Sequence, residues 1–319
     1  MVLTQLVLIA AGFALLLKSS EESIKRVARL ARHFNVSEFA TSFLIVGVVA
    51  IFPELSIGIN SALAGQPAFG VGIVLGSNVA DLSLIIGLIT LAAGRTKIHE
   101  HCLHSLRWFL VPLSLPVFLL LDGTLSRLDG IILIAAFFAY ALFLLRERPL
   151  HSHTEKKAMP WRHVTKEIIF LCISLALLLV SGKIITDAAH EISLALSLPL
   201  LFVGGLLAVG TCLPELSFAL RASQHKHGEL GLGNVFGNVL ADCMLSLGVI
   251  ALIHPFSLAY PQLAITSGAA SALAVALTLV MLGAFRPKDV LTRKEGAVLV
   301  AFYLAFIVFQ TLLEKTLAG

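Results

Sequence analysis

Hydrophobic residues in this chain gather in long runs that are separated by short polar stretches. An α-helix needs about 20 mostly apolar residues to cross a bilayer. Charged and turn residues divide the sequence into ten such runs, and each is expected to form a membrane-spanning helix. The predicted spans are 1–18, 38–64, 67–94, 107–121, 129–145, 164–182, 197–221, 229–253, 262–285 and 295–314. The pattern therefore predicts an all-α integral membrane protein.

The composition supports this prediction. Only 13% of the residues are charged and the mean hydropathy is +0.95, whereas soluble proteins average about 25% charged residues. These values exclude a soluble globular protein, and 58% hydrophobic residues exclude a disordered chain. The four cysteines are too scattered for a disulfide framework, so we expect free thiols, with Cys212 as a small polar filler.

The basic residues follow the predicted spans in alternation. All of the 23 Lys and Arg except Arg127, Lys183 and Lys315 lie in or beside the loops that follow odd-numbered spans. Cytoplasmic loops of membrane proteins carry an excess of Lys and Arg. The alternation therefore predicts a protein of the plasma membrane with both termini outside, and it assigns the small net charge of +4 to orientation, with no nucleic-acid partner.

The two halves of the sequence resemble each other at a constant offset of 161 positions. Residues 52–56 correspond to 213–217, and residues 80–81 correspond to 241–242. Each half holds five predicted spans, so the second half enters the membrane in the opposite orientation, as in many secondary transporters. The predicted parts are a first five-helix repeat at 1–146, a cytoplasmic linker at 147–163 and a second, inverted five-helix repeat at 164–319.

Four acidic residues lie inside predicted spans: Glu54, Asp81, Glu215 and Asp242. A charged side chain in the bilayer costs on the order of 3 kcal/mol, and such residues usually mark an ion path. At 1.5 Å per residue, Glu54 and Asp81 lie about 18 and 21 Å from the turn near Gln66, so both reach mid-membrane. No Lys or Arg lies at comparable depth. We therefore expect the four acids to converge on one site.

Further polar residues lie near these acids. Ser77 and Asn238 precede Asp81 and Asp242 by one helical turn, and Asn78 and Thr211 are close by. The matched prolines Pro53 and Pro214 interrupt their spans and free backbone carbonyls. Such hard oxygen donors suit Ca²⁺, Mg²⁺, Na⁺ or H⁺. The predicted cation ligands are Glu54, Glu215, Asp81, Asp242, Ser77, Asn78, Thr211 and Asn238.

At these residues the sequence resembles the cation/Ca²⁺ exchanger superfamily, most nearly its sodium/calcium exchanger-like branch. Residues 210–215 match the signature Gly-Thr-Ser-x-Pro-Glu except that Cys212 replaces Ser, and residues 76–81 match Gly-Ser-Asn-x-x-(Asn/Asp). The resemblance implies a ten-helix fold with both termini outside. It also implies that Glu54 and Glu215 are the central Ca²⁺ ligands. Asp81 and Asp242 would be further ligands or proton-sensitive groups, and Ser77 and Thr211 would coordinate Na⁺.

The first repeat departs from the family signature, because Ala50 and Ile51 replace its Thr and Ser. Fewer hydroxyls and more acids favour proton coupling, another cation or another stoichiometry. The sequence thus predicts a secondary-active antiporter that exchanges Ca²⁺ against Na⁺ by alternating access, with a Ca²⁺/H⁺ antiporter as the alternative.

Two further alternatives are a cation channel and an intramembrane aspartyl protease that uses Asp81 and Asp242, although the protease accounts for neither Pro-Glu pair. Because there is no Walker or HExxH motif, we expect neither an ATPase nor a zinc protease, and thus no enzyme. The expected partners are inorganic cations and the lipid bilayer. We expect no obligate protein partner and no cofactor besides the transported ions.

Overall fold

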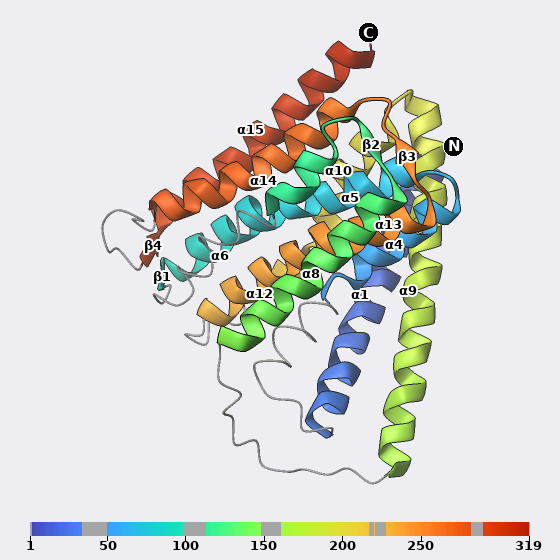
Figure 1. Ribbon diagram of the computed structural model, residues 1–319, viewed down its shortest axis with the longest axis vertical. Helices are drawn as coiled ribbons and strands as arrows, with labels where there is room; N and C mark the ends of the chain where they lie inside the picture. The colour runs from blue at the N-terminus through green and yellow to red at the C-terminus, as the bar shows by residue number, and fades with distance from the viewer. Residues whose placement is uncertain are drawn as a thin grey trace.

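The computed structural model of the protein describes residues 2–33, 50–97, 113–147, 161–216, 220, 228–281 and 290–318. Helices dominate this part of the chain (Figure 1). Six of them are long and apolar enough to cross a membrane. Each of the ten predicted spans contains helix among its described residues.

Two long helices, α1 (Val2–His33) and α9 (Trp161–Leu196), lie side by side (Figure 1). They run at an angle to α14 (Pro261–Met281) and α15 (Arg293–Ala318). The 36 residues of α9 extend over about 54 Å, well beyond the ~30 Å hydrocarbon core of a bilayer. At one end, Glu167 accepts hydrogen bonds from Arg26 and Arg29 of α1, both at 3.0 Å. Large apolar side chains such as Leu3 and Ile169 stay exposed on these helices, as expected of surfaces that face lipid.

The predicted C-terminal ends of two spans, 1–18 and 164–182, are wrong, because the helices continue past the charged residues that follow the apolar runs, to His33 and to Leu196. In α9, Lys183 forms an ion pair with Asp187 one turn later at 2.9 Å. In α1, Lys25 pairs with Glu21 at 2.8 Å in the same i, i+4 arrangement. Such pairs stabilise a helix in water, so the helix does not end where the apolar run ends.

The remaining helices divide between the two halves of the chain. The first half contains α4 (Phe52–Leu63), α5 (Pro67–Val79), the π-helix η2 (Ala80–Ile85), α6 (Ile86–Ala93), helical residues 113–119 and α8 (Arg127–Glu147). The second half contains α10 (Leu200–Thr211), helical residues 213–216, α12 (Gly228–Ala241), the π-helix η3 (Asp242–Ser246), α13 (Leu247–Ile253), α14 (Pro261–Met281) and α15 (Arg293–Ala318).

Helices α5 and α10 cross at backbone contact. A Cβ atom on Gly72 would collide with the carbonyl oxygen of Leu201, and one on Gly204 would collide with the carbonyl oxygen of Phe69. A Cβ on Gly76 would lie 2.8 Å from the Cα of Gly205. Only glycine permits this approach, which brings the C-terminal part of α5 next to the end of α10.

Two short antiparallel strand pairs, which were not predicted from the sequence, join the halves of the chain. Strand β1 (Arg95–Lys97) pairs with β4 (Val290–Thr292), and β2 (Thr124–Leu125) pairs with β3 (Phe256–Ser257). Each pair contains one strand from each half. The strand pairs therefore fasten the two halves to each other at the helix ends.

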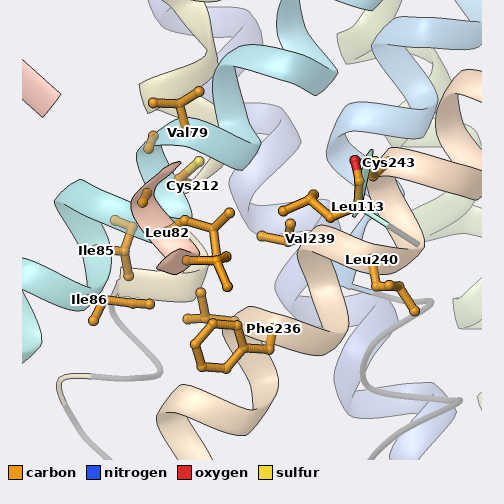
Figure 2. Packing of buried hydrophobic residues seen from close by; sticks show 14 of the residues in the cluster. Val79, Leu82, Ile85, Ile86, Leu113, Cys212, Phe236, Val239, Leu240 and Cys243 are labelled. Carbon is orange, nitrogen blue, oxygen red and sulfur yellow. Dashed lines mark hydrogen bonds between the residues drawn. The ribbon is translucent and has the colours of Figure 1, made fainter. Parts of the chain in front are cut away.

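The largest buried apolar cluster among the described residues lies where the end of α5, η2 and α6 of the first half meet Cys212, α12, η3 and α15 of the second, and Figure 2 shows part of it. It includes Val79, Leu82 and Ile85 from one half and Phe236 and Val239 from the other. It also includes Ala80 and Leu82 on either side of Asp81, and Ala241 and Cys243 on either side of Asp242, so it packs the segments that carry these two acids.

Candidate cation site

Two helix breaks lie at equivalent positions in the two halves, and both are next to a proline. Ile51 adopts a turn before α4, which has Pro53 in its first turn, and Cys212 adopts a turn between α10 and the helical residues 213–216. Since Pro214 has no N–H, it donates no hydrogen bond to the carbonyl of Gly210 four residues earlier. The prediction that the matched prolines interrupt helices is confirmed. In the first half the equivalent carbonyl belongs to Val49, which lies outside the described residues.

The four acids follow these breaks or open the π-helices. Glu54 and Glu215 lie in the first turn after a break, where the helix dipole favours negative charge. Asp242 is the first residue of η3, and Asp81 is the second residue of η2. The exposed fractions of Glu54, Asp81, Glu215 and Asp242 are 1%, 1%, 3% and 2%. All four carboxyl groups are thus removed from solvent.

The acids are also close to one another. The carboxyl group of Glu54 lies near enough to those of Asp242 and Glu215 for their charges to repel. The carboxyl group of Glu215 is likewise near enough to those of Asp81 and Asp242 for their charges to repel. The structure therefore gathers the four acids in one region, as expected from the sequence. Because two of them come from each half, the region lies between the halves.

Two hydrogen bonds connect the halves at this site in a reciprocal way. Ser77 Oγ in the first half donates to Asp242 Oδ2 at 2.9 Å, and Asn238 Nδ2 in the second half donates to Asp81 Oδ2 at 3.0 Å. These residues correspond through the offset of 161 positions, so the same bond is made twice. Ser77 and Asn238 therefore bind the acid of the opposite half rather than the acid one turn away on their own helix.

Several buried oxygens at the site have no hydrogen-bond partner in the described part of the chain. They are Glu54 Oε1 and Oε2, Asp81 Oδ1, Glu215 Oε2, Asp242 Oδ1, Asn78 Oδ1 and Asn238 Oδ1. Buried polar atoms are nearly always paired. The ion pairs described for the structure involve none of the four acids. These oxygens are therefore the ones that cations or protons would satisfy.

The described residues do not form a ready-made metal cage, because no three His, Cys, Asp or Glu side chains among them are gathered closely enough to hold one ion. Ca²⁺ usually takes six to eight oxygens, which include carbonyls as well as carboxylates. A cation at this site would therefore combine a few carboxylate oxygens with amide, hydroxyl and main-chain oxygens. The carbonyl of Gly210 is one such candidate, since Pro214, four residues later, has no N–H to donate to it.

The remaining predicted ligands also lie in this region. Thr211 is buried beside Glu54, and its Oγ1 donates to the carbonyl of Ala208 at 2.8 Å. Asn78 is buried on α5, and neither end of its amide has a partner among the described residues. Cys212 is expected from the sequence to be a small polar filler, whereas the structure places its thiol next to Asp81. The position of Cys212 directly before a Pro-Glu pair was the signal available in the sequence.

Comparison with known proteins gives matches over nearly the whole chain. The family described as "Sodium/calcium exchanger protein" matches residues 4–146 and 166–312. "Putative antiporter CaxA" of Alkalimonas amylolytica is 25% identical over 315 residues, which cover 96% of this chain and 98% of that protein. "Sodium/calcium exchanger MaX1" of Methanosarcina acetivorans is 25% identical, with 97% and 99% of the two chains covered.

Solved structures of a sodium/calcium exchanger also match this chain. The exchanger from Methanococcus jannaschii is 25% identical, has a TM-score of 0.63, and is matched over 97% of this chain and 99% of its own. A structure of the exchanger NCX_Mj soaked with 100 mM Na⁺ and 10 mM Sr²⁺ gives a TM-score of 0.67 at 24% identity and the same coverage. These neighbours are all-α membrane proteins with ten spans in inverted repeats, so the predicted fold class is confirmed.

Proposed function

Since this chain belongs to the sodium/calcium exchanger protein family, we propose that it exchanges Ca²⁺ against Na⁺ by alternating access. Family membership makes the protein a multi-pass membrane cation antiporter and not an enzyme. The predicted family resemblance is thereby confirmed, and the channel and protease interpretations are set aside.

The observation that carries the proposal is the group of four buried acids with unpartnered oxygens between the two halves. Four ionised carboxylates without basic partners are too costly to keep in a low-dielectric interior, so cations or protons must compensate their charge. In the proposal, Glu54 and Glu215 are the main Ca²⁺ ligands, and Asp81 and Asp242 lie beside them. The further oxygen donors are Ser77, Asn78, Thr211 and Asn238.

The same charge explains why such a protein would exchange ions rather than leak them. A site without cations or protons would leave the carboxylates ionised and unpaired, and that state is unfavourable for the conformational change. The change would then take place only when Ca²⁺, or the ions exchanged for it, occupy the acids. Ca²⁺ is therefore carried across the membrane in one direction only in exchange for ions that are carried in the other direction.

Proton coupling is the second candidate, and a specific observation favours it. The helix break of the first half is lined by Ala50 and Ile51, both buried and without a hydroxyl. This half therefore offers fewer neutral oxygens for Na⁺ than the second half, where Thr211 lies at the break. Acids at both positions 81 and 242 provide groups that bind H⁺ instead.

The proposal also includes the topology. The alternation of basic residues supports a plasma-membrane protein with both termini outside. It likewise supports the division into a first repeat at 1–146, a cytoplasmic linker at 147–163 and a second, inverted repeat at 164–319.

Transport into vesicles containing the purified protein tests the proposal. Ca²⁺ uptake is measured with an outward Na⁺ gradient at equal pH, and then with a pH gradient in the absence of Na⁺. The proposal predicts uptake with the Na⁺ gradient and none with the pH gradient. The converse result would establish the proton-coupled alternative, and uptake that needs neither gradient would contradict both.

A further inference from the structure

We infer that Cys212 is a ligand of the transported cation, and that the site therefore accepts thiophilic divalent cations such as Cd²⁺ in addition to Ca²⁺. The inference rests on the proposed function for the position of the site, and it adds a substrate class. Cys212 carries a sulfur donor, whereas the residue at the equivalent position of the first half has no donor atom.

The thiol of Cys212 lies at the helix break of the second half, among the acids. The residue is 1% exposed, and its Sγ lies 3.3 Å from the carbonyl oxygen of Ala208 and 3.7 Å from that of Ser77. It also contacts the Asp81 carboxylate and lies close enough to Glu54 and Glu215 for electrostatic interaction. Figure 2 shows the sulfur beside Val79 and Leu82 of the first half.

Unpartnered carboxylate oxygens around this sulfur supply the second, independent observation. Glu54 Oε1 and Oε2, Asp81 Oδ1 and Glu215 Oε2 are buried and have no hydrogen-bond partner in the described ranges. Asp81 is the acid beside the sulfur, so a cation bound to Asp81 Oδ1 would come within reach of the sulfur, with Glu54 and Glu215 near enough to stabilise its charge. A thiolate selects softer metals, and carboxylates alone select hard ones, so the mixed set suits ions such as Cd²⁺ and Zn²⁺.

The sulfur donor is present on one side of the site only. The position of the first half that corresponds to Cys212 through the 161-residue offset is Ile51, which is fully buried and has no donor atom. A thiophilic ion would therefore be held by one sulfur, the Asp81 carboxylate and main-chain oxygens such as those of Ser77 and Ala208, not by a cysteine pair. When the sulfur coordinates the ion, the S–H proton is released to solvent, so the thiol contributes one proton for each Cd²⁺ bound.

The chain provides a matched control at Cys243. This thiol is also buried and is next to Asp242 in the sequence. Its Sγ, however, lies 4.0 Å from the carbonyl oxygen of Leu113 (Figure 2). Of the acids that the structure describes, only Asp242 interacts with this thiol, whereas three interact with that of Cys212. If burial beside an acid were sufficient for metal binding, both cysteines would respond to Cd²⁺. The inference predicts that only Cys212 does.

The direct test is Cd²⁺ titration of purified protein in which Cys212 is the only cysteine, made by C102S, C172S and C243S. Ultraviolet absorption from sulfur-to-cadmium charge transfer reports the bond. The band is expected in this variant and should be absent when C212S or C212A is added. Excess Ca²⁺ should displace the Cd²⁺ and so abolish the band. Adding Glu54→Gln should weaken Cd²⁺ binding by more than about tenfold, because even outer-shell partners of metal ligands contribute that much.

Competition in the transport assay completes the test. The Cd²⁺ concentration that inhibits Ca²⁺ uptake should be more than about tenfold higher in Cys212→Ser than in the parent protein. In Cys243→Ser it should equal that of the parent protein. An absent band, a band unaffected by Ca²⁺, or unchanged inhibition in Cys212→Ser would overturn the inference while Ca²⁺ uptake still supports the proposed function. A Ca²⁺-sensitive band in a protein without Ca²⁺ uptake would instead refute the proposed function alone.

Discussion

Replacing Gly72 by alanine should separate the two helices that cross beside the candidate site. The added methyl group would collide with the carbonyl oxygen of Leu201 and would lie 2.8 Å from its carbonyl carbon and 3.0 Å from its Cα. These are backbone atoms, which cannot rotate away as a side chain can. Helices α5 and α10 must therefore move apart, and with them Ser77 and Thr211, which those helices carry.

The expected magnitude follows from two opposing effects. Overpacking a well-packed interior typically costs about 1–3 kcal/mol, and a collision with backbone belongs at the upper end of that range. Alanine regains up to about 1 kcal/mol in a helix interior relative to glycine. The free energy of unfolding should therefore fall by about 2 kcal/mol in Gly72→Ala.

Gly205 on the facing helix is the matched control. A Cβ atom there has only the carbonyl oxygen of Gly72 nearby, at 3.8 Å, which is ordinary van der Waals contact. Gly205→Ala should therefore keep or slightly raise the stability, by up to about 1 kcal/mol.

Denaturant titration of the purified protein in detergent compares these two variants with the parent protein. If α5 and α10 are in backbone contact at Gly72, the free energy of unfolding should be lower in Gly72→Ala and should not decrease in Gly205→Ala. Ca²⁺ uptake should be reduced in Gly72→Ala only. Equal stability of the two variants would refute the backbone contact, and so would a loss confined to Gly205→Ala.

Two further substitutions test the contacts between elements. Ser77→Ala removes the one donor described for Asp242 Oδ2, so the free energy of unfolding should fall by about 1–3 kcal/mol in denaturant titration. Ser83→Ala loses only a bond within its own helix and should lose less, so an equal loss in both would contradict the contact between the halves. Glu167→Gln removes the partner of two arginines of α1 and should lower the thermal midpoint at low salt, with a loss of up to about 1 kcal/mol that fades at high salt. Asp187→Asn, which breaks the exposed pair with i, i+4 spacing in α9, should change the midpoint less, and a larger effect there would count against the α1–α9 contact.

The membrane spans and the helix breaks could be predicted because their causes are local. Apolar runs mark the spans, and proline cannot donate the hydrogen bond that would continue a helix past Ile51 or Cys212. That the acids lie in one region could also be predicted, since helix rise puts Glu54 and Asp81 at similar distances from the turn between their helices. The ends of α1 and α9 could not be predicted in this way, because ion pairs within each helix extend it beyond its apolar run.

The contacts between the halves could not be predicted, because they depend on which helices face each other. Helical spacing correctly puts Ser77 on the same face as Asp81, yet the hydrogen bond of Ser77 goes to Asp242 of the other half. The strand pairs β1–β4 and β2–β3 escaped prediction for the same reason, since each strand has two or three residues and finds its partner in the opposite half. The inverted repeat indicates that the halves are related, but it does not specify how they pack.

The central claim is that Glu54 and Glu215 bind the transported cation, and one flux measurement tests it most directly. Ca²⁺ uptake driven by an outward Na⁺ gradient is compared in the parent protein, Glu54→Gln, Glu215→Gln and Glu314→Gln. Glu314 is the matched control, because its carboxyl group is also buried but lies near the C-terminal end of α15. The account predicts that both site variants fold and lose uptake while Glu314→Gln retains it, whereas uptake at the parent rate in Glu54→Gln and Glu215→Gln would contradict it.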